Sequence, residues 1–375
     1  MEDLIAIRRY LHQHPELSGF EMRTSDFLIK EFKQLKTTQI IEEIGGHGFI
    51  VIFDSGMEGP SLLFRSELDG LPIQESSDLE YKSIFNSKGH QCGHDGHMSI
   101  LLGLGKQLAA NPIKKGKVTL LFQPAEETGE GAEAVIHDPL FRDLRFDEVF
   151  ALHNLPSFPF GAIIVKNDSF TAAVKSVVIE LHGKTAHASE PENGINPAKA
   201  VGEILKDIEE LNINEPEQAN FKLATLVHVK IGEPAYGVAA GDASIHYTFR
   251  SWTNEKLAEL ENEIIEKATA IANNNQLRIS HHFLQRFYAS ENNPESVDLV
   301  RKACEKSGFN LIENSTPFKW GEDFGYFTKK YKGCLFGLGA GLNQPALHHP
   351  DYDFPDQLLK KGVEIFYAII KERLE

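Results

Sequence analysis

The sequence has few cysteines, no long apolar run and no excess of basic residues. Three cysteines cannot build a disulfide framework, and an odd number is typical of a reducing compartment. No stretch reaches the roughly 18 uninterrupted apolar residues of a membrane-spanning helix. Lys and Arg total 38 against 54 Asp and Glu, and the resulting charge of −16 argues against nucleic acid as a partner. The charged beginning, MEDLIAIRRYLHQHPEL, lacks a signal peptide's apolar segment, so we expect a cytoplasmic protein with no membrane partner.

Both ends of the chain show short apolar runs that alternate with helical periodicity. The length of 375 residues exceeds what one hydrophobic core usually serves, and the 41% apolar content is ordinary for a globular chain. Strands are predicted at 49–53, 61–64, 118–122, 148–152 and 334–338, and helices at 98–110 and 358–373. Strands that alternate with helices predict an α/β domain with a central mixed sheet.

The middle of the chain has a different rhythm, which predicts a second domain. Its elements follow the order β-α-β-β-α-β, at 175–181, 196–211, 221–231, 243–250, 254–272 and 276–283. This order is typical of small ferredoxin-like domains. We therefore expect residues 171–284 to form a ferredoxin-like domain inserted into an α/β domain made of residues 1–170 and 285–375.

Reactive side chains follow several predicted strands, at the point where each strand ends. Ligands bind beyond the carboxyl ends of the strands in an open α/β sheet. The residues at these ends, and before the helix at 98–110, include Arg65, Glu67, Asp69, Cys92, His94, His97, Glu126, Glu127, His153 and His348. Cysteine, histidine and glutamate together are typical of a site for zinc, manganese, cobalt or nickel.

Each of these residues also has an ordinary explanation when it is taken alone. Cys92 could be a buried thiol, Glu126 and Glu127 could begin a solvated helix, and His153 and His348 could be a core and a loop residue. Their coincidence at separate strand ends favours a single metal site. Glu67 and His97 remain ambiguous, and we leave them outside the predicted ligand set.

Seven motifs resemble those of co-catalytic metallo-amidohydrolases, a family that includes aminoacylases, hippurate hydrolases and indole-acetyl-amino-acid hydrolases. They are RRYLHQHPELSGFE, HQCGHDGHMSILLG, FQPAEETGEGAEAVI, ALHNLP, HGKTAHAS, GEDFGYF and ALHHPDYDFPD, spanning residues from about 8 to 355. The resemblance implies a metal-binding catalytic α/β domain and an inserted lid, through which the chain would form a homodimer.

The resemblance also implies roles for individual residues. The ligands of two divalent ions (Zn, Mn, Co or Ni) would be Cys92, His94, Glu127, His153 and His348. Glu126 would be the general base and Asp69 would support the ligands. His187 of KTAHA would reach the reacting carbonyl oxygen, and Arg250 would bind a substrate carboxylate.

One stretch departs from the family pattern and affects the expected substrate. Many relatives have Asn-Val-Ile-Pro-Asp before the strand that carries the arginine, whereas residues 235–242 read AYGVAAGD. The asparagine near the substrate is therefore replaced by Tyr236 or displaced. The resemblance implies metal-dependent hydrolysis of the amide bond of N-acyl amino acids, with deacylation of a small molecule. A dipeptidase or carboxypeptidase that acts on small peptides, a hydrolase with Cys92 as nucleophile, and a non-catalytic metal- or ligand-binding protein are the alternatives.

Overall fold

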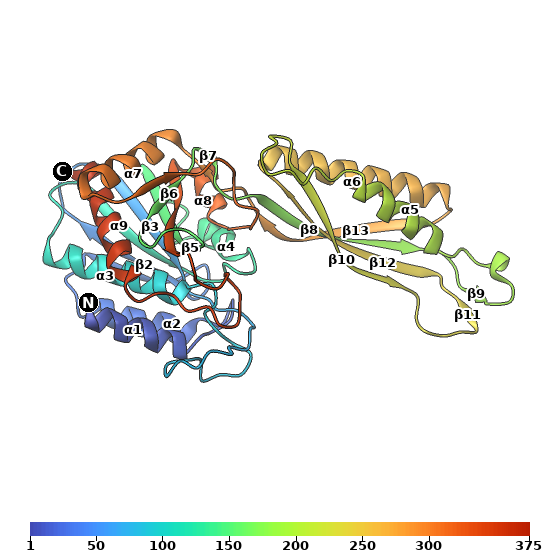
Figure 1. The fold of residues 1–375 in the computed structure, drawn as a ribbon, viewed down its shortest axis with the longest axis horizontal. Coiled ribbons are helices and arrows are strands. Elements are labelled where there is room, and N and C mark those ends of the chain that lie inside the picture. Colours follow the sequence, from blue (N-terminus) through green and yellow to red (C-terminus); the bar gives the residue numbers. More distant parts are fainter. The chain divides into compact units, whose positions relative to one another are not determined.

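The computed structural model describes residues 1–375, which divide into two compact units (Figure 1). Unit 1 contains Met1–Phe170, Ser290–Ser315 and Glu322–Glu375, and unit 2 contains Thr171–Ala289 and Thr316–Gly321. Residues 285–289 and 316–321 thus join the inserted unit, which the sequence pattern had ended at residue 284. Residues 316–321 belong to unit 2 because they pair with its first residues: the backbone N–H of Ala172 donates to the carbonyl oxygen of Phe318 at 2.9 Å.

Unit 1 is built on an eight-stranded mixed sheet with the order β1-β2-β4-β3-β5-β16-β6-β15. The strands are β1 (Gln39–Ile44), β2 (Gly48–Asp54), β3 (Ser61–Glu67), β4 (Lys117–Gln123), β5 (Glu148–Pro156), β6 (Ile163–Val165), β15 (Leu311–Glu313) and β16 (Gly333–Gly341). The four central strands β4, β3, β5 and β16 run parallel, and β1 and β2 pair antiparallel at one edge. This sheet confirms the predicted α/β fold class.

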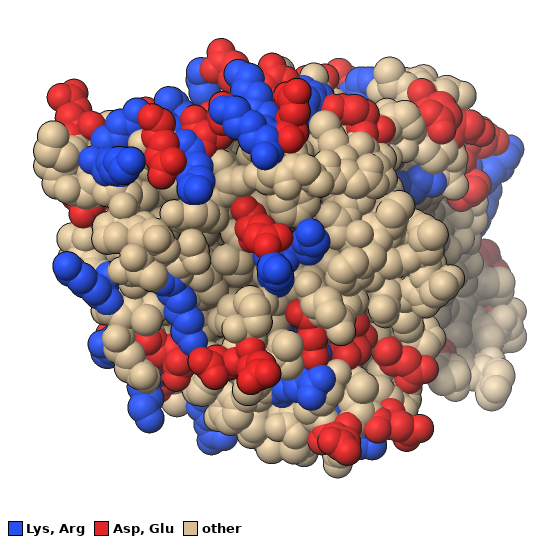
Figure 2. Space-filling model, turned by 60° about the vertical axis from the view of Figure 1, so that its left-hand side comes forward, with Lys and Arg blue, Asp and Glu red and all other residues tan.

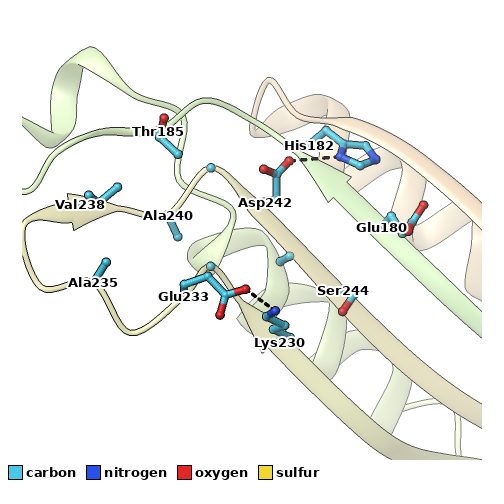
Figure 3. A pocket seen from close by; sticks show the side chains of 13 residues that line it. Glu180, His182, Thr185, Lys230, Glu233, Ala235, Val238, Ala240, Asp242 and Ser244 are labelled. Carbon is cyan, nitrogen blue, oxygen red and sulfur yellow. Dashed lines mark hydrogen bonds and ion pairs between the residues drawn. The ribbon is translucent and has the colours of Figure 1, made fainter.

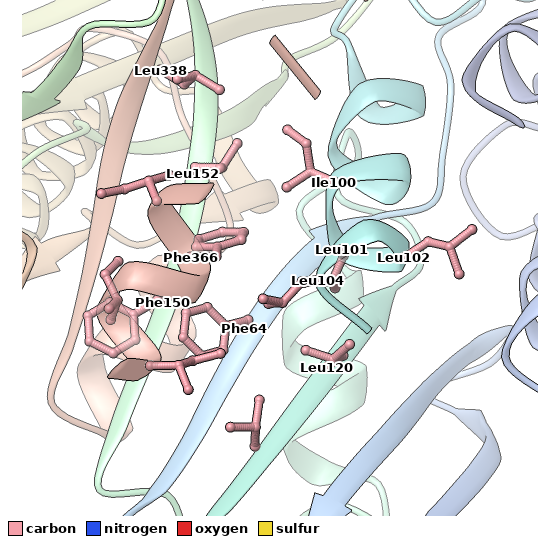
Figure 4. Close-up of a cluster of buried hydrophobic side chains, with 14 of the residues drawn as sticks. Phe64, Ile100, Leu101, Leu102, Leu104, Leu120, Phe150, Leu152, Leu338 and Phe366 are labelled. Carbon is pink, nitrogen blue, oxygen red and sulfur yellow. The ribbon is translucent and has the colours of Figure 1, made fainter. Parts of the chain in front are cut away.

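The helices of unit 1 pack against this sheet and against one another. They are α1 (Glu2–Gln13), α2 (Met22–Phe32), α3 (His94–Ala110), α4 (Gly131–His137), α7 (Pro294–Ser307), α8 (Gly325–Lys330) and α9 (Leu358–Leu374). Aromatic rings of β3, β5 and α9 meet in the core, where Phe64 lies 5.5 Å from Phe150 and 5.0 Å from Phe366 between ring centroids (Figure 4). Each such side chain contributes about 1.5–3 kcal/mol when it is buried.

Helix α3 is buried on almost every side, and its close packing depends on glycine. A Cβ atom on Gly362 of α9 would lie 2.3 Å from Ile100 Cδ1, a contact that no larger residue allows. Ile100 and Leu104 of α3 point toward the sheet and α9, whereas Leu102 points to the opposite side of the helix (Figure 4). This packing fixes the first turn of α3, which begins at His94.

Unit 2 has a four-stranded antiparallel sheet with the order β10-β12-β8-β13. Its strands are β8 (Ala173–His182), β10 (Lys222–Ile231), β12 (Asp242–Ser251) and β13 (Arg278–Phe287), and α5 (Ala198–Glu209) and α6 (Asn254–Asn274) cover one face (Figure 1). Strands β8 and β12, the first and third along the chain, lie at the centre, and all neighbouring strands of this sheet are antiparallel. This is the ferredoxin-like arrangement that the element order predicts.

Basic and acidic side chains are interspersed on the face shown in Figure 2, with uncharged surface between them. None of the helices combines the length and the apolar character that crossing a bilayer requires.

Candidate metal centre and active site

The structure brings together the five side chains predicted as metal ligands. The donor atoms of Cys92, His94 and His153 all lie within 4.8 Å of one another, and so do those of Cys92, Glu127 and His348. Glu126 forms a further group of this kind with His94 and Glu127. All of these residues belong to unit 1.

Their convergence follows from the parallel centre of the sheet. His153 lies in β5, opposite Gly337 of β16, and Glu126 and Glu127 follow the end of β4. Strand β5 runs on to Pro156, so His153 lies within it and not after it as the sequence pattern predicted. Because parallel strands end at one edge, His153 and the residues after β4 and β16 meet there. The backbone N–H of His348 donates to the carbonyl oxygen of Gln91 at 2.9 Å, which ties the loop after β16 to the loop that carries Cys92.

Hydrogen bonds orient the two buried histidine rings. His94 Nδ1 donates to the carbonyl oxygen of Asp69 at 2.8 Å, which leaves Nε2 directed at Glu127. His153 Nδ1 donates to the carbonyl oxygen of Asn154 at 3.0 Å, and its Nε2 lies 3.5 Å from Cys92 Sγ. A hydrogen bond on one ring nitrogen that presents the other is the usual arrangement for a metal-binding histidine.

Two of the facing atoms are buried and have no hydrogen-bond partner. They are His94 Nε2 and Glu127 Oε1, 3.9 Å apart, and His348 Nε2 lies 3.7 Å from the other oxygen of Glu127. A buried polar atom without a partner typically costs about 1–3 kcal/mol. Thiol, imidazole and carboxylate groups around such atoms fit divalent transition metals.

Glu126 and Glu127 are held in a shared buried environment. Burial, reinforced by Glu322 and Glu127, raises the pKa of Glu126 well above its usual range. Burial also raises the pKa of Glu127 to about 7, although the neighbouring His94 opposes this shift. One oxygen of Glu126 accepts the backbone N–H of Asp323 at 3.4 Å, so this carboxylate stays inside the site.

A buried ion cluster next to Glu126 was not predicted from the sequence. Arg65 is 1% exposed, and its guanidinium pairs with Glu67, with Glu322 at 3.0 Å and with Asp323 at 2.5 Å. Gln123 accepts from Arg65 Nε at 2.9 Å. The available signal was an arginine inside the apolar strand SLLFRSE, together with the acidic pair in GEDFGYF.

The same cluster explains Glu67 and His97, which the sequence left ambiguous. One oxygen of Glu67 pairs with Arg65, and the other accepts from His97 Nδ1 at 2.7 Å. His97 Nε2 in turn accepts the backbone N–H of Asn154 at 3.3 Å. Glu67 and His97 therefore both form hydrogen bonds or ion pairs with other groups of the protein.

Asp69 and Cys92 also occupy defined positions. Asp69 is fully buried and accepts the backbone N–H of Glu127 at 3.0 Å and the hydroxyl of Ser18 at 2.7 Å. Burial, together with Glu127 and Glu126, raises the pKa of Cys92 well above its usual range. A reactive cysteine needs the opposite shift, which disfavours Cys92 as a nucleophile.

The remaining predicted residues, His187, Arg250 and Tyr236, all belong to unit 2. His187 ends the short strand β9 (Ala186–His187), is exposed, and pairs through Nδ1 with the Ser189 hydroxyl at 2.7 Å. Arg250, near the end of β12, is half-buried and has no ion-pair partner, and burial lowers its pKa. Tyr236 is 96% exposed in the turn before β11 (Val238–Ala239).

A pocket of about 400 Å³ adjoins this turn within unit 2 (Figure 3). Its lining includes Val238, whose Cα faces His187 across the β9–β11 pairing, and Asp242, which pairs with His182 at 3.1 Å. Polar side chains of Lys230 and Glu233 pair with each other at its rim (Figure 3).

Comparison with known proteins identifies the family. Residues 63–372 match the profile of Peptidase family M20/M25/M40. The chain belongs to this family. Over 379 residues this M20 chain is 30% identical to the N-acetyldiaminopimelate deacetylase of Streptococcus uberis (strain ATCC BAA-854 / 0140J), with 100% of both chains covered. It is 31% identical to the hippurate hydrolase of Campylobacter jejuni (strain ATCC 700819 / NCTC 11168), which covers 96% of this chain and 94% of the relative.

A solved structure of an M20 protein has the same fold as this chain. The dinuclear metal-binding peptidase of the M20 family from Bacillus subtilis superposes with a TM-score of 0.85 at 25% identity, covering 100% of this chain and 99% of that one. The family and the full-length relatives make this M20 chain a hydrolase of the amidohydrolase type, as the sequence predicts.

Proposed function

We propose that this protein is a two-metal amidohydrolase that removes the acyl group from N-acyl amino acids, giving a carboxylic acid and a free amino acid. The observation that carries the proposal is the convergence of five donor side chains around buried, unpartnered His94 Nε2 and Glu127 Oε1, with Glu126 beside them. The relatives named above act on an acetylated and on a benzoylated amino acid, which supports the substrate class.

In the proposed mechanism Cys92, His94, Glu127, His153 and His348 would hold two divalent ions of the Zn, Mn, Co or Ni class. When bound, such ions polarise the carbonyl group and acidify water. Glu126 would accept a proton from the attacking water and deliver it to the departing nitrogen, and burial prepares it for this task by raising its pKa. Asp69 would hold both His94 and the backbone of Glu127 in place.

Unit 2 would supply the substrate-binding groups. Arg250 would pair with the carboxylate of the amino-acid part, because its guanidinium is half-buried and has no ion-pair partner. His187 would hydrogen-bond the developing oxyanion, a contribution whose loss typically lowers the rate about 10²–10³-fold. The asparagine of relatives would be replaced by Tyr236 or displaced, and the phenol would reshape the substrate pocket.

We further propose a homodimer through unit 2. Strand β10 lies at an open edge of its sheet, and Leu226 and Val227 are 44% and 64% exposed there. An open edge with apolar side chains is a surface on which a second strand can pair. Sedimentation equilibrium of the protein and of V227K, which places a charge on this edge, tests the proposal. A monomeric wild type would contradict it.

The activity is tested with Glu126→Gln and the matched control Glu130→Gln, which changes an exposed glutamate in the same turn. E126Q should bind metal as the wild type does and lose about 10²–10⁴-fold in kcat, whereas E130Q should keep its activity. Chelation should abolish hydrolysis, and Zn, Mn, Co or Ni added separately should restore it. The substrates are N-acetyl, N-benzoyl and longer N-acyl amino acids beside dipeptides. Near-normal turnover by E126Q, or hydrolysis of dipeptides alone, would overturn the proposal.

A further inference from the structure

The buried carboxylate of Glu21 contacts the turn that carries Glu126, and none of the roles proposed above uses it. Glu21 is 0% exposed and follows the segment HPELSGF near the beginning of the chain. One of its oxygens accepts the backbone N–H of Ala125 at 2.8 Å and that of Gly19 at 2.9 Å. Ala125 directly precedes Glu126 and Glu127.

Ala125 has a backbone conformation that residues with a side chain seldom adopt. Its φ of 51° lies in the left-handed region, where contact between Cβ and the carbonyl oxygen is unfavourable. Such a conformation persists only where surrounding contacts enforce it. The carbonyl oxygen of Ala125 accepts the N–H of Gly131 at 3.0 Å, so Glu21 and Gly131 together hold both polar groups of this residue.

The loop that contains Glu21 also reaches the other end of the same turn. Ser18 donates to Asp69, and Asp69 accepts the backbone N–H of Glu127. The N–H groups on either side of Glu126 are therefore both fixed by carboxylates, one from Glu21 and one from Asp69. The direction of the Glu126 side chain depends on these two fixed peptide groups.

We propose that Glu21 is a positioning residue, which holds Ala125 in the left-handed conformation and thereby sets the orientation of Glu126 and Glu127. The inference rests on the proposed function for its catalytic consequence, but its effect on the ligand Glu127 can be measured without turnover. Without the carboxylate, the part-buried N–H of Ala125 loses its acceptor, and the alanine can relax towards negative φ. That rotation would carry both glutamates away from the site.

The variant Glu21→Ala tests the proposal, with Glu21→Gln and Glu16→Ala as comparisons. E21A should lower kcat by about 10²-fold, the effect of a misplacement of about 1 Å, with KM little changed. It should also weaken Zn or Mn binding about 10–100-fold in titration calorimetry. E21Q keeps an oxygen for Ala125 and should stay close to the wild type. E16A removes another carboxylate of the same segment, one that accepts from Thr24, and should change neither value.

A second substitution separates positioning from general support of the fold. In E21A/A125G, glycine adopts the left-handed conformation without strain, so metal affinity and kcat should largely return. If E21A does not fold, Ala125→Val, which keeps Glu21 but disfavours positive φ, should reproduce both losses in a folded protein. Wild-type affinity in E21A, or losses that A125G does not reverse, would overturn the inference. Failure of the proposed function would instead appear as a wild type that binds metal and hydrolyses no N-acyl amino acid.

Discussion

Replacing Arg65 by methionine should destabilise unit 1 strongly. Arg65 is the only arginine or lysine that pairs with Glu67, Glu322 and Asp323, and all four side chains are at most 1% exposed. Breaking a buried ion pair from one side costs about 3–5 kcal/mol, because the partner charge remains buried. Methionine fills a similar volume, so little of this cost arises from a cavity. We expect R65M to lose about 4 kcal/mol at pH 8.

The penalty should depend on pH in a defined direction. Burial and Glu322, opposed by Arg65, already raise the pKa of Asp323 to about 8, and loss of the guanidinium raises it further and removes a charge that holds the pKa of Glu67 well below its usual range. A carboxyl group with a raised folded pKa destabilises the fold at pH values where it would otherwise be ionised. The penalty should therefore be largest at pH 8 and shrink at pH 5.5, where these groups take up protons.

Urea denaturation of the metal-free protein, followed by hydrogen exchange in peptides of β3 and β4, measures this effect. Both tryptophans, Trp252 and Trp320, belong to unit 2, so tryptophan fluorescence reports the other unit as an internal control. Arg65→Lys keeps the charge but not the planar set of donors, and its loss should be smaller. An R65M protein as stable as the wild type at pH 8, or a penalty that grows towards pH 5.5, would refute the reasoning.

Two further predictions concern other buried groups. Burial opposes the charge of His12, but hydrogen bonds to Asp95 at 2.9 Å and Glu75 at 3.2 Å raise its pKa to about 9, above the unfolded value of 6.5. Its contribution to the free energy of unfolding should be complete below pH 6.5 and disappear as pH rises through 9. The prediction would be contradicted if the unfolding midpoint changed with pH in the same way in His12→Asn and in the wild type. Asp69→Ala should weaken metal binding about 10–100-fold by calorimetry, because the backbone N–H of Glu127 loses its acceptor and the ring of His94 loses the carboxylate 3.5 Å from its Nδ1; an unchanged affinity would contradict it.

The central elements could be predicted from the sequence because they are apolar and buried on both faces. Strands β3, β4, β5 and β16 read as continuous apolar runs, which is typical of parallel strands at the centre of a sheet. Three strands at the margins, β1, β6 and β15, were not predicted, and β1 is a mostly exposed edge strand of six residues, QIIEEI, with acidic residues inside it. Strands β6 and β15 have three residues each, too few for a periodic pattern to emerge.

The ligand set was accessible from strand ends and motif resemblance, whereas its supporting contacts were not. Asp69 pairs with the backbone of Glu127, and Arg65 meets Asp323, 258 positions along the chain. Glu21 contacts the backbone of Ala125, and nothing in its local spacing indicates that partner. Which residues become partners in this way depends on the tertiary fold. A single sequence therefore shows that a polar residue is present, but not which distant group it contacts.

Residues 316–321 make unit 2 a structure of two chain segments, and this affects any attempt to exchange it between relatives. A graft cut at residues 170 and 290 would leave out two residues of the second segment. One is Phe318, whose carbonyl oxygen accepts the N–H of Ala172. The other is Lys319, whose ammonium lies 5.3 Å from the ring centre of Phe221. Phe221 stacks on Trp252 within unit 2. A chimaera that exchanges unit 2 therefore has to transplant both segments, because the longer segment alone would lack the ammonium that lies over the Phe221–Trp252 ring pair.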